Sequence, residues 1–255
     1  MTNPSFALSG RKALVTGASR GIGEAIAVGL AEAGADVAVA ARESSTLAAT
    51  AAAIAGAGRR SAAIAIDVRD PAAIRAGVDK AAQALGGLDI LVNNAGVEEV
   101  RDSLAVDEAL WDRIVDTNLK GAFFCAQAAA RIMAEAKGGA IVNLCSLTSE
   151  VGVPRAVPYG SSKSGLLGMT RALAAEWAAK GIRVNGIGPG YFRTELTEVF
   201  YQNADWQQAM LAKIPLRRFG RLEDLVGAAV FLCSDAAAYI TGQCLYIDGG
   251  YLASI

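Results

Sequence analysis

Residues 12–34 read KALVTGASRGIGEAIAVGLAEAG: a short apolar run, a glycine-rich turn and a segment of helical length. Glycines in such a turn permit a tight bend and a close approach of a ligand to the backbone, and the N-terminus of the following helix offers unpaired amides to a pyrophosphate. The spacing G-x-x-x-G-x-G lacks the Gly-Lys-Ser/Thr ending of a P-loop, which disfavours a kinase or an NTPase. The stretch therefore predicts a dinucleotide-phosphate site at Gly17, Ser19, Arg20, Gly21, Ile22 and Gly23.

Short apolar runs alternate with segments of helical length from this stretch to the C-terminus. The apolar runs lie at residues 12–17, 36–41, 61–67, 88–94, 140–146, 183–188 and 243–248. The helical segments lie at residues 22–34, 43–57, 71–85, 107–137, 158–180 and 222–234. Near-continuous apolar strands separated by helices predict a parallel sheet buried on both faces, with right-handed crossovers. We expect an α/β fold: a doubly wound, seven-stranded parallel sheet flanked by helices on both faces.

The length of 255 residues allows one large α/β domain or two ordinary ones. No Pro/Ser-rich linker or charge run interrupts the alternation, so we expect one domain over residues 1–255. Residues 190–218 break the rhythm and gather aromatic side chains, namely Tyr191, Phe192, Phe200, Tyr201 and Trp206. Long irregular insertions are commonly lids, so we predict a substrate lid at about residues 190–218. The alternative is that these rings only pack the insertion onto the core, and both can hold.

The composition disfavours several classes of protein. The formal net charge is −1, with Lys and Arg scattered among acids, so no basic face for nucleic acid is expected. No uninterrupted apolar run approaches the ~20 residues that span a bilayer. The N-terminus lacks a basic region followed by an apolar one, and the four widely spaced cysteines fit reduced core thiols. We therefore expect a cytoplasmic protein without nucleic-acid or membrane partners.

The sequence contains no histidine. This absence excludes Ser-His-Asp and Cys-His hydrolysis, HExxH zinc sites, and dehydrogenases that transfer the proton through a histidine. Any acid/base chemistry must come from carboxylates, lysine, tyrosine or cysteine.

Residues 143–163, NLCSLTSEVGVPRAVPYGSSK, carry the candidate chemistry. Tyr159 and Lys163 are four residues apart, so on a helix they share one face. A free tyrosine titrates near pH 10, and a fixed cation within roughly 4–6 Å lowers its pKa toward the range of a general acid/base. Ser146 supplies a hydroxyl that can hold a substrate oxygen beside the phenol. An isolated Tyr-x-x-x-Lys pair is more often a solvated helix face, so its context decides. This chemistry requires no metal.

The tips of the next strands predict the rest of the dinucleotide site. Arg42 follows the second strand, and with Arg20 it presents two guanidiniums that suit a 2′-phosphate. We therefore predict NADP(H) in preference to NAD(H). The alternative is that Glu43 reaches the ribose hydroxyls instead. Asp67 and Val68 end the third strand, where they can reach an adenine ring. The fourth strand ends in a polar turn beneath the cofactor, formed by Asn94, Ala95 and Gly96.

These landmarks occur in one order with Asn118, Ser146, Tyr159, Lys163, Pro189 and Gly190. With them the chain resembles the short-chain dehydrogenase/reductase family over essentially its whole length. The resemblance implies a Rossmann fold in which Tyr159 donates or accepts the proton and Ser146 orients the carbonyl or hydroxyl. It implies that Lys163 lowers the pKa of Tyr159 and, with Tyr159, contacts the cofactor at the nicotinamide ribose.

The resemblance implies three further features. Asn118 is similar to an asparagine that holds a water in the proton relay, although it also fits a residue that kinks a helix. Pro189, Gly190 and Thr194 correspond to positions near the nicotinamide. A homotetramer is implied, built on the C-terminal strand and on the helices at 107–137 and 158–180, whose apolar and alanine-rich faces exceed what one sheet needs to cover. Those faces carry Ala126, Ala128, Ala129, Ala130, Leu166, Leu167, Met169 and Leu173. The alternative is a purely internal packing role.

The substrate is less sharply indicated. The segments SLTSEVG, GPGYFRTELT and YIDGGYLASI resemble the branch that contains gluconate 5-dehydrogenases, which favours a sugar acid or a polyol. The 3-oxoacyl-carrier-protein reductases share most landmarks, so a 3-oxoacyl thioester or a small or aromatic ketone is the alternative. A sugar acid needs cations. Arg101, Arg155 and Arg193 are the candidates, and Glu98, Glu99 and Glu150 oppose them. The predicted pocket consists of Val97, Leu147, Val153, Tyr191 and Phe200.

A protein of a different class, a non-catalytic cofactor sensor, would keep the nucleotide site without turnover. Such a protein has no need of Asn118, Ser146, Tyr159 and Lys163 together. The joint pattern therefore favours an NAD(P)-dependent enzyme that acts on CH–OH or C=O groups.

Overall fold

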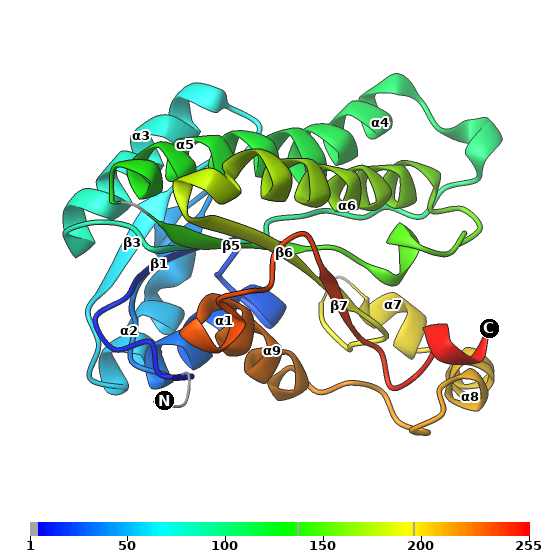
Figure 1. Cartoon of the computed structure of the whole chain (residues 1–255). Coiled ribbons are helices and arrows are strands. Elements are labelled where there is room, and N and C mark those ends of the chain that lie inside the picture. The colour runs from blue at the N-terminus through cyan, green and yellow to red at the C-terminus, as the bar shows by residue number, and fades with distance from the viewer. Residues whose placement is uncertain (1–4, 137, 196) are drawn as a thin grey trace.

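The structure is a computed structural model that describes residues 5–136, 138–195 and 197–255, with the side chains of residues 199 and 200 left undescribed. Its centre is a parallel sheet in the order β3-β2-β1-β4-β5-β6-β7 (Figure 1). The strands are β1 (Lys12–Thr16), β2 (Asp36–Ala41), β3 (Ser61–Ala65), β4 (Ile90–Asn93), β5 (Gly139–Leu144), β6 (Ile182–Pro189) and β7 (Cys244–Ile247). The predicted doubly wound sheet of seven parallel strands is confirmed.

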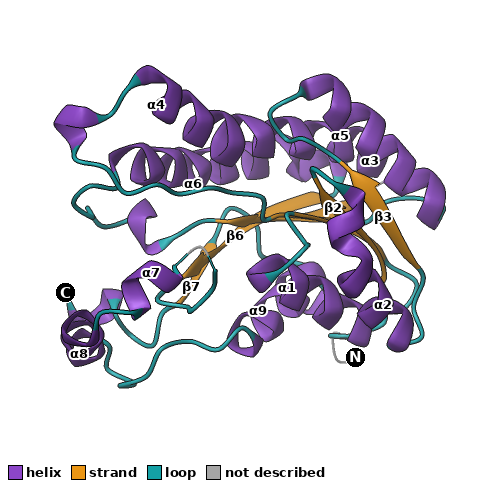
Figure 2. Ribbon diagram, turned by 180° about the vertical axis from the view of Figure 1, so that it is seen from behind, coloured by secondary structure: helices purple, strands orange, loops and turns teal. Residues whose placement is uncertain are grey.

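Helices cover both faces of the sheet. They are α1 (Gly21–Glu32), α2 (Ala48–Gly56), α3 (Pro71–Leu85), α4 (Glu108–Val115), α5 (Gly121–Glu135), α6 (Val157–Trp177), α7 (Glu198–Tyr201), α8 (Ala204–Lys213) and α9 (Glu223–Cys233). Figures 1 and 2 show α3, α4, α5 and α6 over one face and α1, α2 and α9 over the other. Both views place α7 and α8 near β7, at the end of the molecule that holds the C-terminus.

The strand pleat divides the core into two layers. Along β1, Ala13 and Val15 pack into the cluster that contains α1 and α9, whereas Leu14 packs into the cluster that contains α3 and α5. Successive side chains of a strand point to opposite faces, so a strand covered on both sides must be apolar throughout. This is the physical reason why the strands read as near-continuous apolar runs.

The 107–137 segment is not one uninterrupted α-helix. A π-helical turn, Asp116–Lys120, separates α4 from α5. Gly121 follows this turn, and a Cβ added there would lie 2.5 Å from the Val68 carbonyl oxygen. The helix therefore approaches the end of β3 more closely than a side chain would allow, and π-bulges of this kind are frequent at functional sites.

The sequence predicted an irregular insertion at residues 190–218. This prediction is wrong in part, because α7 and α8 lie within the segment. Asn203 starts α8 by accepting a hydrogen bond from the Trp206 amide at 3.0 Å. Asparagine at this position supplies the acceptor that the first turn of a helix lacks, so Asn203 is a recognisable helix N-cap. The sequence prediction followed the aromatic residues of the segment and did not use this cap.

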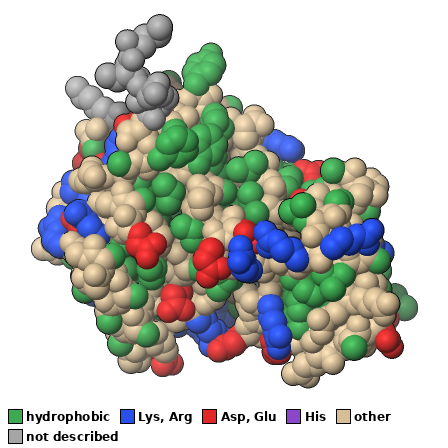
Figure 3. All heavy atoms as spheres, turned by 90° about the horizontal axis from the view of Figure 1, so that it is seen from below, with side chains coloured by type: hydrophobic (Ala, Val, Ile, Leu, Met, Phe, Trp, Pro, Cys, Tyr) green, Lys and Arg blue, Asp and Glu red, His purple; other side chains and the backbone are tan. Residues whose placement is uncertain are grey.

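The face formed by α1, α2 and α9 carries acidic and basic side chains side by side, around scattered hydrophobic ones (Figure 3). No helix within the described ranges is long and apolar enough to cross a membrane. Cys125, Cys145, Cys233 and Cys244 are all free thiols.

Candidate active site

The candidate site lies along the carboxyl edge of the sheet, where β1 and β4 meet. The chain leaves β1 toward β2 on one side and reaches β4 on the other, so the strand order reverses at this point. In open α/β sheets, ligands bind in the crevice outside the carboxyl ends of the strands at such a switch point. The landmarks predicted from the sequence follow β1, β4, β5 and β6 and therefore meet at this edge.

The glycine turn after β1 has the geometry of a phosphate cradle. Gly17 and Gly21 have φ angles of 64° and 60°, which favour glycine over any residue with a Cβ. A Cβ on Gly17 would lie 2.8 Å from the Ala95 Cα. Arg20, the first residue before α1, makes no capping hydrogen bond with its side chain, so the helix N-terminus keeps amides for a ligand. The turn therefore fits the dinucleotide phosphates that the sequence predicts.

Asn94 holds this turn in place rather than facing a ligand with its amide. Its Nδ2 donates to the carbonyl oxygens of Thr16 and Gly17, at 3.0 and 2.9 Å. The Thr16 hydroxyl in turn accepts from the backbone amides of Asn94 and Ala95, each at 3.1 Å. These bonds fasten the end of β4 to the end of β1. Thr16 was not singled out from the sequence, and its signal was a polar residue at the end of an apolar strand.

The residues predicted to read the adenosine end are partly engaged with one another. Arg20 pairs with Glu195, with 2.9 Å between the guanidinium and the carboxylate, and both side chains are exposed. Asp67 pairs with Arg69 at 2.9 Å, and this hydrogen-bonded partner holds the pKa of Asp67 below its usual value despite partial burial. The Arg42 guanidinium lies exposed after β2 and adds to the field that stabilises the Asp67 carboxylate.

The three central residues come together as predicted. Ser146 follows β5 and Tyr159 stands in the first turn of α6, and their hydroxyls share a hydrogen bond. The Lys163 Nζ lies 5.6 Å from the centroid of the Tyr159 ring and donates to the Leu144 carbonyl oxygen at 2.5 Å. Lys163 is only 5% exposed, so its ammonium is fixed beneath the phenol rather than solvated. The alternative of a solvated helix face is therefore wrong.

The ionisation of the pair differs from the expectation. Burial raises the pKa of Tyr159, the Glu98 carboxylate raises it further, and the hydrogen bond from Ser146 lowers it in part. Burial lowers the pKa of Lys163 to about 8, against the opposing fields of Cys145 and Glu98. The expectation of a Tyr159 pKa below its usual value is therefore wrong for the protein alone, because burial and the Glu98 carboxylate raise it.

Asn118 lies in the π-helical turn and is fully engaged through its side chain. Its Oδ1 accepts from the Val97 amide at 2.8 Å, and its Nδ2 donates to the Val97 carbonyl oxygen at 2.9 Å. Nδ2 also donates to the Ser162 hydroxyl at 3.1 Å. The side chain therefore fixes the loop after β4 against α6.

A buried polar network supports the site from below. Asn93 Nδ2 donates to the side-chain oxygen of Asn143 at 3.0 Å, and Asn143 Nδ2 donates to the Thr170 hydroxyl at 2.9 Å. These residues link the ends of β4 and β5 to α6. The sequence analysis missed this network, although polar residues in apolar strands were its visible signal.

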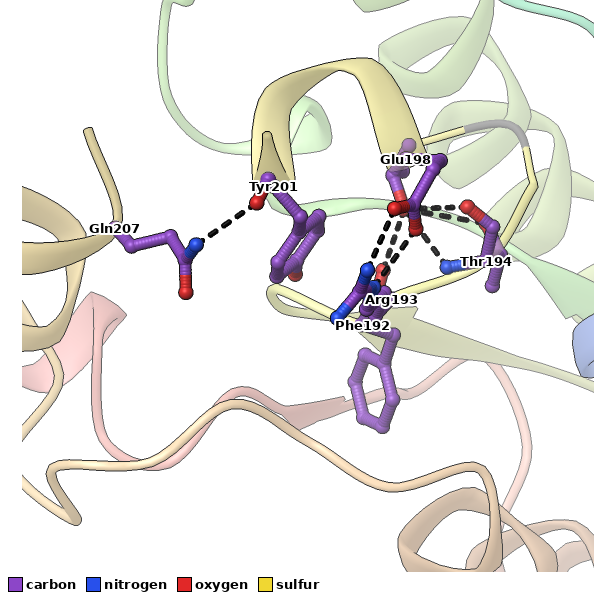
Figure 4. A network of polar contacts seen from close by, with 7 residues as sticks. Phe192, Arg193, Thr194, Glu198, Tyr201 and Gln207 are labelled. Carbon is purple, nitrogen blue, oxygen red and sulfur yellow. Dashed lines mark hydrogen bonds and ion pairs between the residues drawn. The ribbon is translucent and has the colours of Figure 1, made fainter. Parts of the chain in front are cut away.

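The segment after β6 forms a compact unit of its own (Figure 4). Arg193 grips Glu198 with two hydrogen bonds of 2.7 and 2.6 Å, and the Thr194 amide donates to the Thr197 hydroxyl at 2.9 Å. Gln207 of α8 donates to the Tyr201 carbonyl oxygen at 2.8 Å. These contacts make the segment from β6 to α8 self-supporting, with Pro189, Gly190 and Thr194 at its base.

Aromatic rings join this segment to the C-terminus. The Tyr191 ring packs on Trp206 and Tyr251, with centroids 5.8 and 5.3 Å apart, and Tyr201 packs on Phe219 at 4.8 Å. Tyr191 also lines a cavity of about 250 Å³ with Ile214, Asp248 and others. Neither Ser146 nor Tyr159 lines that cavity. The sequence left open whether the aromatic rings of this segment also pack it onto the rest of the protein. The Tyr191 ring does pack in this way.

The remaining predicted pocket residues differ in their surroundings. Val97 lies on the loop held by Asn118, and Leu147 is buried directly after Ser146. Val153 is exposed, and the side chain of Phe200 lies outside the described residues. Across the described part of the chain, no group of three or more Cys, Asp or Glu residues could hold a metal ion.

Comparison with known proteins gives a consistent result. Residues 17–252 match the family model described as enoyl-(acyl carrier protein) reductase. Gluconate 5-dehydrogenase of Gluconobacter oxydans is 39% identical over the full length of both chains. The crystal structure of a putative short-chain alcohol dehydrogenase from Sinorhizobium meliloti is 71% identical, with a TM-score of 0.97, covering 99% of this chain and 100% of its own. That of a gluconate 5-dehydrogenase from Burkholderia cenocepacia, in complex with NADP and tartrate, is 38% identical with a TM-score of 0.95 and 98% coverage of both chains.

Proposed function

Since the chain belongs to the short-chain dehydrogenase/reductase family and is an oxidoreductase acting on CH–OH and C=O groups, we propose that it uses NADP(H) with Tyr159 as its general acid/base. One observation carries the proposal. A buried ammonium, a phenol and a hydroxyl meet after β5, on the same carboxyl edge of the sheet as the open N-terminus of α1. A protein that only sensed the cofactor would have no use for this arrangement.

Each residue has one step in the proposed reaction. Bound NADP(H) supplies or accepts the hydride. Ser146 holds the substrate oxygen against the Tyr159 hydroxyl, with which it already shares a hydrogen bond. Tyr159 passes a proton to that oxygen in reduction and removes it in oxidation. Lys163 stabilises the phenolate and contacts the nicotinamide ribose, and the Asn118 turn holds the relay water.

The direction of each pKa shift fits these roles. Burial favours the neutral phenol of Tyr159, the form that donates a proton to a carbonyl oxygen during reduction. Oxidation requires the phenolate, which the Lys163 ammonium and the positive charge of an oxidised nicotinamide favour together. The same pair of residues therefore supports both directions.

The residues that hold the cofactor lie in sequence order along the sheet edge. The phosphates bind at the cradle of Gly17, Ser19, Arg20, Gly21, Ile22 and Gly23. Arg42 and Arg20 would hold the 2′-phosphate, with Arg20 paired to Glu195 when no phosphate is bound. Asp67 and Val68 border the adenine. Asn94, Ala95, Gly96, Pro189, Gly190 and Thr194 surround the nicotinamide half. The NADP in the complex of the Burkholderia cenocepacia relative supports this choice of cofactor.

The proposed substrate is polyhydroxylated, a sugar acid or a polyol, in keeping with the gluconate 5-dehydrogenases to which the chain is similar. The segment of α7 and α8 serves as its lid within one domain of 255 residues. The four free thiols support a cytoplasmic location. The 3-oxoacyl-[acyl-carrier-protein] reductases to which the chain is also similar support a 3-oxoacyl thioester as the alternative substrate.

A substrate screen tests this function. NADP⁺ and NAD⁺ reduction is measured with sugar acids, polyols and simple secondary alcohols, alongside NADPH oxidation with a 3-oxoacyl thioester and with small and aromatic ketones. We expect turnover with polyhydroxylated substrates and a higher kcat/KM for NADP⁺ than for NAD⁺. Turnover confined to the thioester would identify the protein as a 3-oxoacyl thioester reductase instead. A preference for NAD⁺ would overturn the cofactor assignment.

A further inference from the structure

Glu98 is a carboxyl group at the catalytic pair that the mechanism above does not use. It lies two residues after Gly96, on the loop that follows β4, and it interacts electrostatically with both Tyr159 and Lys163. The preceding residue, Val97, is fixed through its amide and its carbonyl oxygen by Asn118, at 2.8 and 2.9 Å. Asn118 also donates to the Ser162 hydroxyl, which donates to the Tyr159 carbonyl oxygen, so the loop that carries Glu98 is anchored beside the first turn of α6.

The neighbouring carboxylate, Glu99, has a different environment. Glu99 forms ion pairs with Arg101 and Arg113, so its charge is neutralised within the protein. Glu98 is half-buried, and within the described residues it makes no hydrogen bond and no ion pair. A half-buried carboxylate without a hydrogen-bond donor is unfavourable, so this group is available to a ligand that brings a donor.

Two of the three arginines considered for an anionic substrate are already paired with carboxylates. Arg101 pairs with Glu99, and Arg193 pairs with Glu198 through two hydrogen bonds. Lys163 donates to the Leu144 carbonyl oxygen deep in the site. Arg155 is exposed and has a φ of 68°, in the loop before α6. No arginine of the three considered from the sequence therefore offers a free, buried guanidinium to a substrate carboxylate.

The three carboxylates that would repel an anionic substrate, Glu98, Glu99 and Glu150, differ in whether they already have a partner. Glu150 is exposed and accepts a hydrogen bond from the Tyr246 hydroxyl at 2.9 Å. Glu99 is neutralised by its two arginines. Glu98 alone of these three acts on both members of the catalytic pair. Among these three carboxylates, Glu98 is therefore the one that adds negative charge beside Tyr159 and Lys163.

We propose that Glu98 is a specificity residue that accepts a hydrogen bond from a substrate hydroxyl next to the reacting carbon and so selects neutral polyols and hydroxyketones over sugar acids. This inference rests on the proposed function and narrows its substrate class. A polyol supplies the O–H donor that the carboxylate lacks. A sugar acid places a second negative charge near Glu98, and such a pair is repulsive. Partial burial raises the pKa of Glu98, in keeping with the shortage of donors around it.

Tartrate and threitol of matching configuration test the proposal. They share one carbon skeleton and the same pair of central hydroxyls, and they differ only in carboxylate against CH₂OH ends. Binding of each to the full-length protein with saturating NADP⁺ is measured by isothermal titration calorimetry, which does not depend on turnover. The variants are Glu98→Gln, which keeps size and removes charge, and Glu150→Gln, a matched control at a carboxylate that already has a partner.

We expect the wild type and Glu150→Gln to bind threitol at least about tenfold more tightly than tartrate, and Glu98→Gln to reduce that ratio by about tenfold. Tighter binding of tartrate by the wild type, an unchanged ratio in Glu98→Gln, or binding of neither compound would overturn the role of Glu98. Turnover separates this result from the proposed function. An enzyme that oxidises gluconate better than glucitol with NADP⁺ refutes only the role of Glu98. A protein that binds threitol preferentially but oxidises no alcohol refutes the reaction.

Discussion

At the scale of single residues, Lys163 shows most directly that the burial needed to position a catalytic group can disfavour its charged form. Its ammonium lies beneath the Tyr159 ring with the Leu144 carbonyl oxygen as its hydrogen-bond acceptor. Burial lowers the pKa of this group to about 8, so the charged form that catalysis needs is also the form that the fold disfavours.

This conflict predicts a pH dependence of stability. An unfolded lysine titrates near 10.4, so between about pH 8 and 10 the unfolded chain binds more protons at this position than the folded chain. The contribution of Lys163 to the free energy of unfolding therefore rises with pH across that window, by at most about 1.4 kcal/mol per pH unit. Urea denaturation of the wild type and Lys163→Met should show a difference, wild type minus variant, that increases above pH 8. A difference that decreases there would contradict the buried, pKa-lowered lysine.

Arg42 carries the cofactor preference at the same scale. Its guanidinium is exposed after β2, where a 2′-phosphate would neutralise it. Arg42→Gln should raise the KM for NADPH by about tenfold and leave that for NADH nearly unchanged, because only NADPH carries the phosphate. Arg75→Gln, at an exposed position on α3, is the matched control. Equal effects of Arg42→Gln on both cofactors would rule out the phosphate contact.

At the scale of elements, the turn from β1 to α1 is restricted by both backbone conformation and space. Gly17→Ala places a Cβ at a φ of 64° and within 2.8 Å of the Ala95 backbone, so the turn must shift. We expect a loss of about 1–3 kcal/mol in unfolding free energy and loss of NADP⁺ binding, measured by urea denaturation and calorimetry.

Gly227→Ala is the contrasting change at a glycine inside a helix. A Cβ there meets nothing within 4 Å, and the position is exposed on α9. Alanine should stabilise this helix by up to about 1 kcal/mol. If Gly17→Ala were as well tolerated as Gly227→Ala, the close approach of the turn to Ala95 would be wrong.

The elements also show which features the sequence can predict. Strands such as β1 and β2 are recognisable because burial on both faces makes every position apolar, whichever way it points. The hydrogen bonds of Asn118 to Val97 are not, because they join residues that are distant in sequence, although a helix kink at Asn118 was one of the two expectations. The direction of the Tyr159 shift was missed for a similar reason. Proximity to Lys163 follows from a four-residue spacing, whereas burial and the field of Glu98 depend on the complete fold.

At the scale of the whole molecule, the apolar faces of α5 and α6 do not need a second subunit to cover them. Ala126, Ala128, Ala129 and Ala130 of α5 are buried within one chain, and so are Leu166, Leu167 and Leu173 of α6. Their apolar character is explained by internal packing against the sheet and neighbouring helices. The homotetramer remains a prediction from the family alone.

We predict a homotetramer at micromolar concentration, and sedimentation equilibrium measures it directly. With 26.2 kDa per chain, a mass of about four chains is the expected result. A species of one chain at that concentration would show that internal packing is the whole role of these faces.

The central claim, that Tyr159 transfers the proton, is tested most directly by removing its hydroxyl. Carbonyl-dependent NADPH oxidation is measured for Tyr159→Phe and for Tyr239→Phe, a control at a fully exposed tyrosine. NADPH binding to each variant is measured alongside. The account predicts that Tyr159→Phe binds NADPH but loses at least about 100-fold in kcat, whereas Tyr239→Phe matches the wild type. Unchanged turnover in Tyr159→Phe would contradict the account.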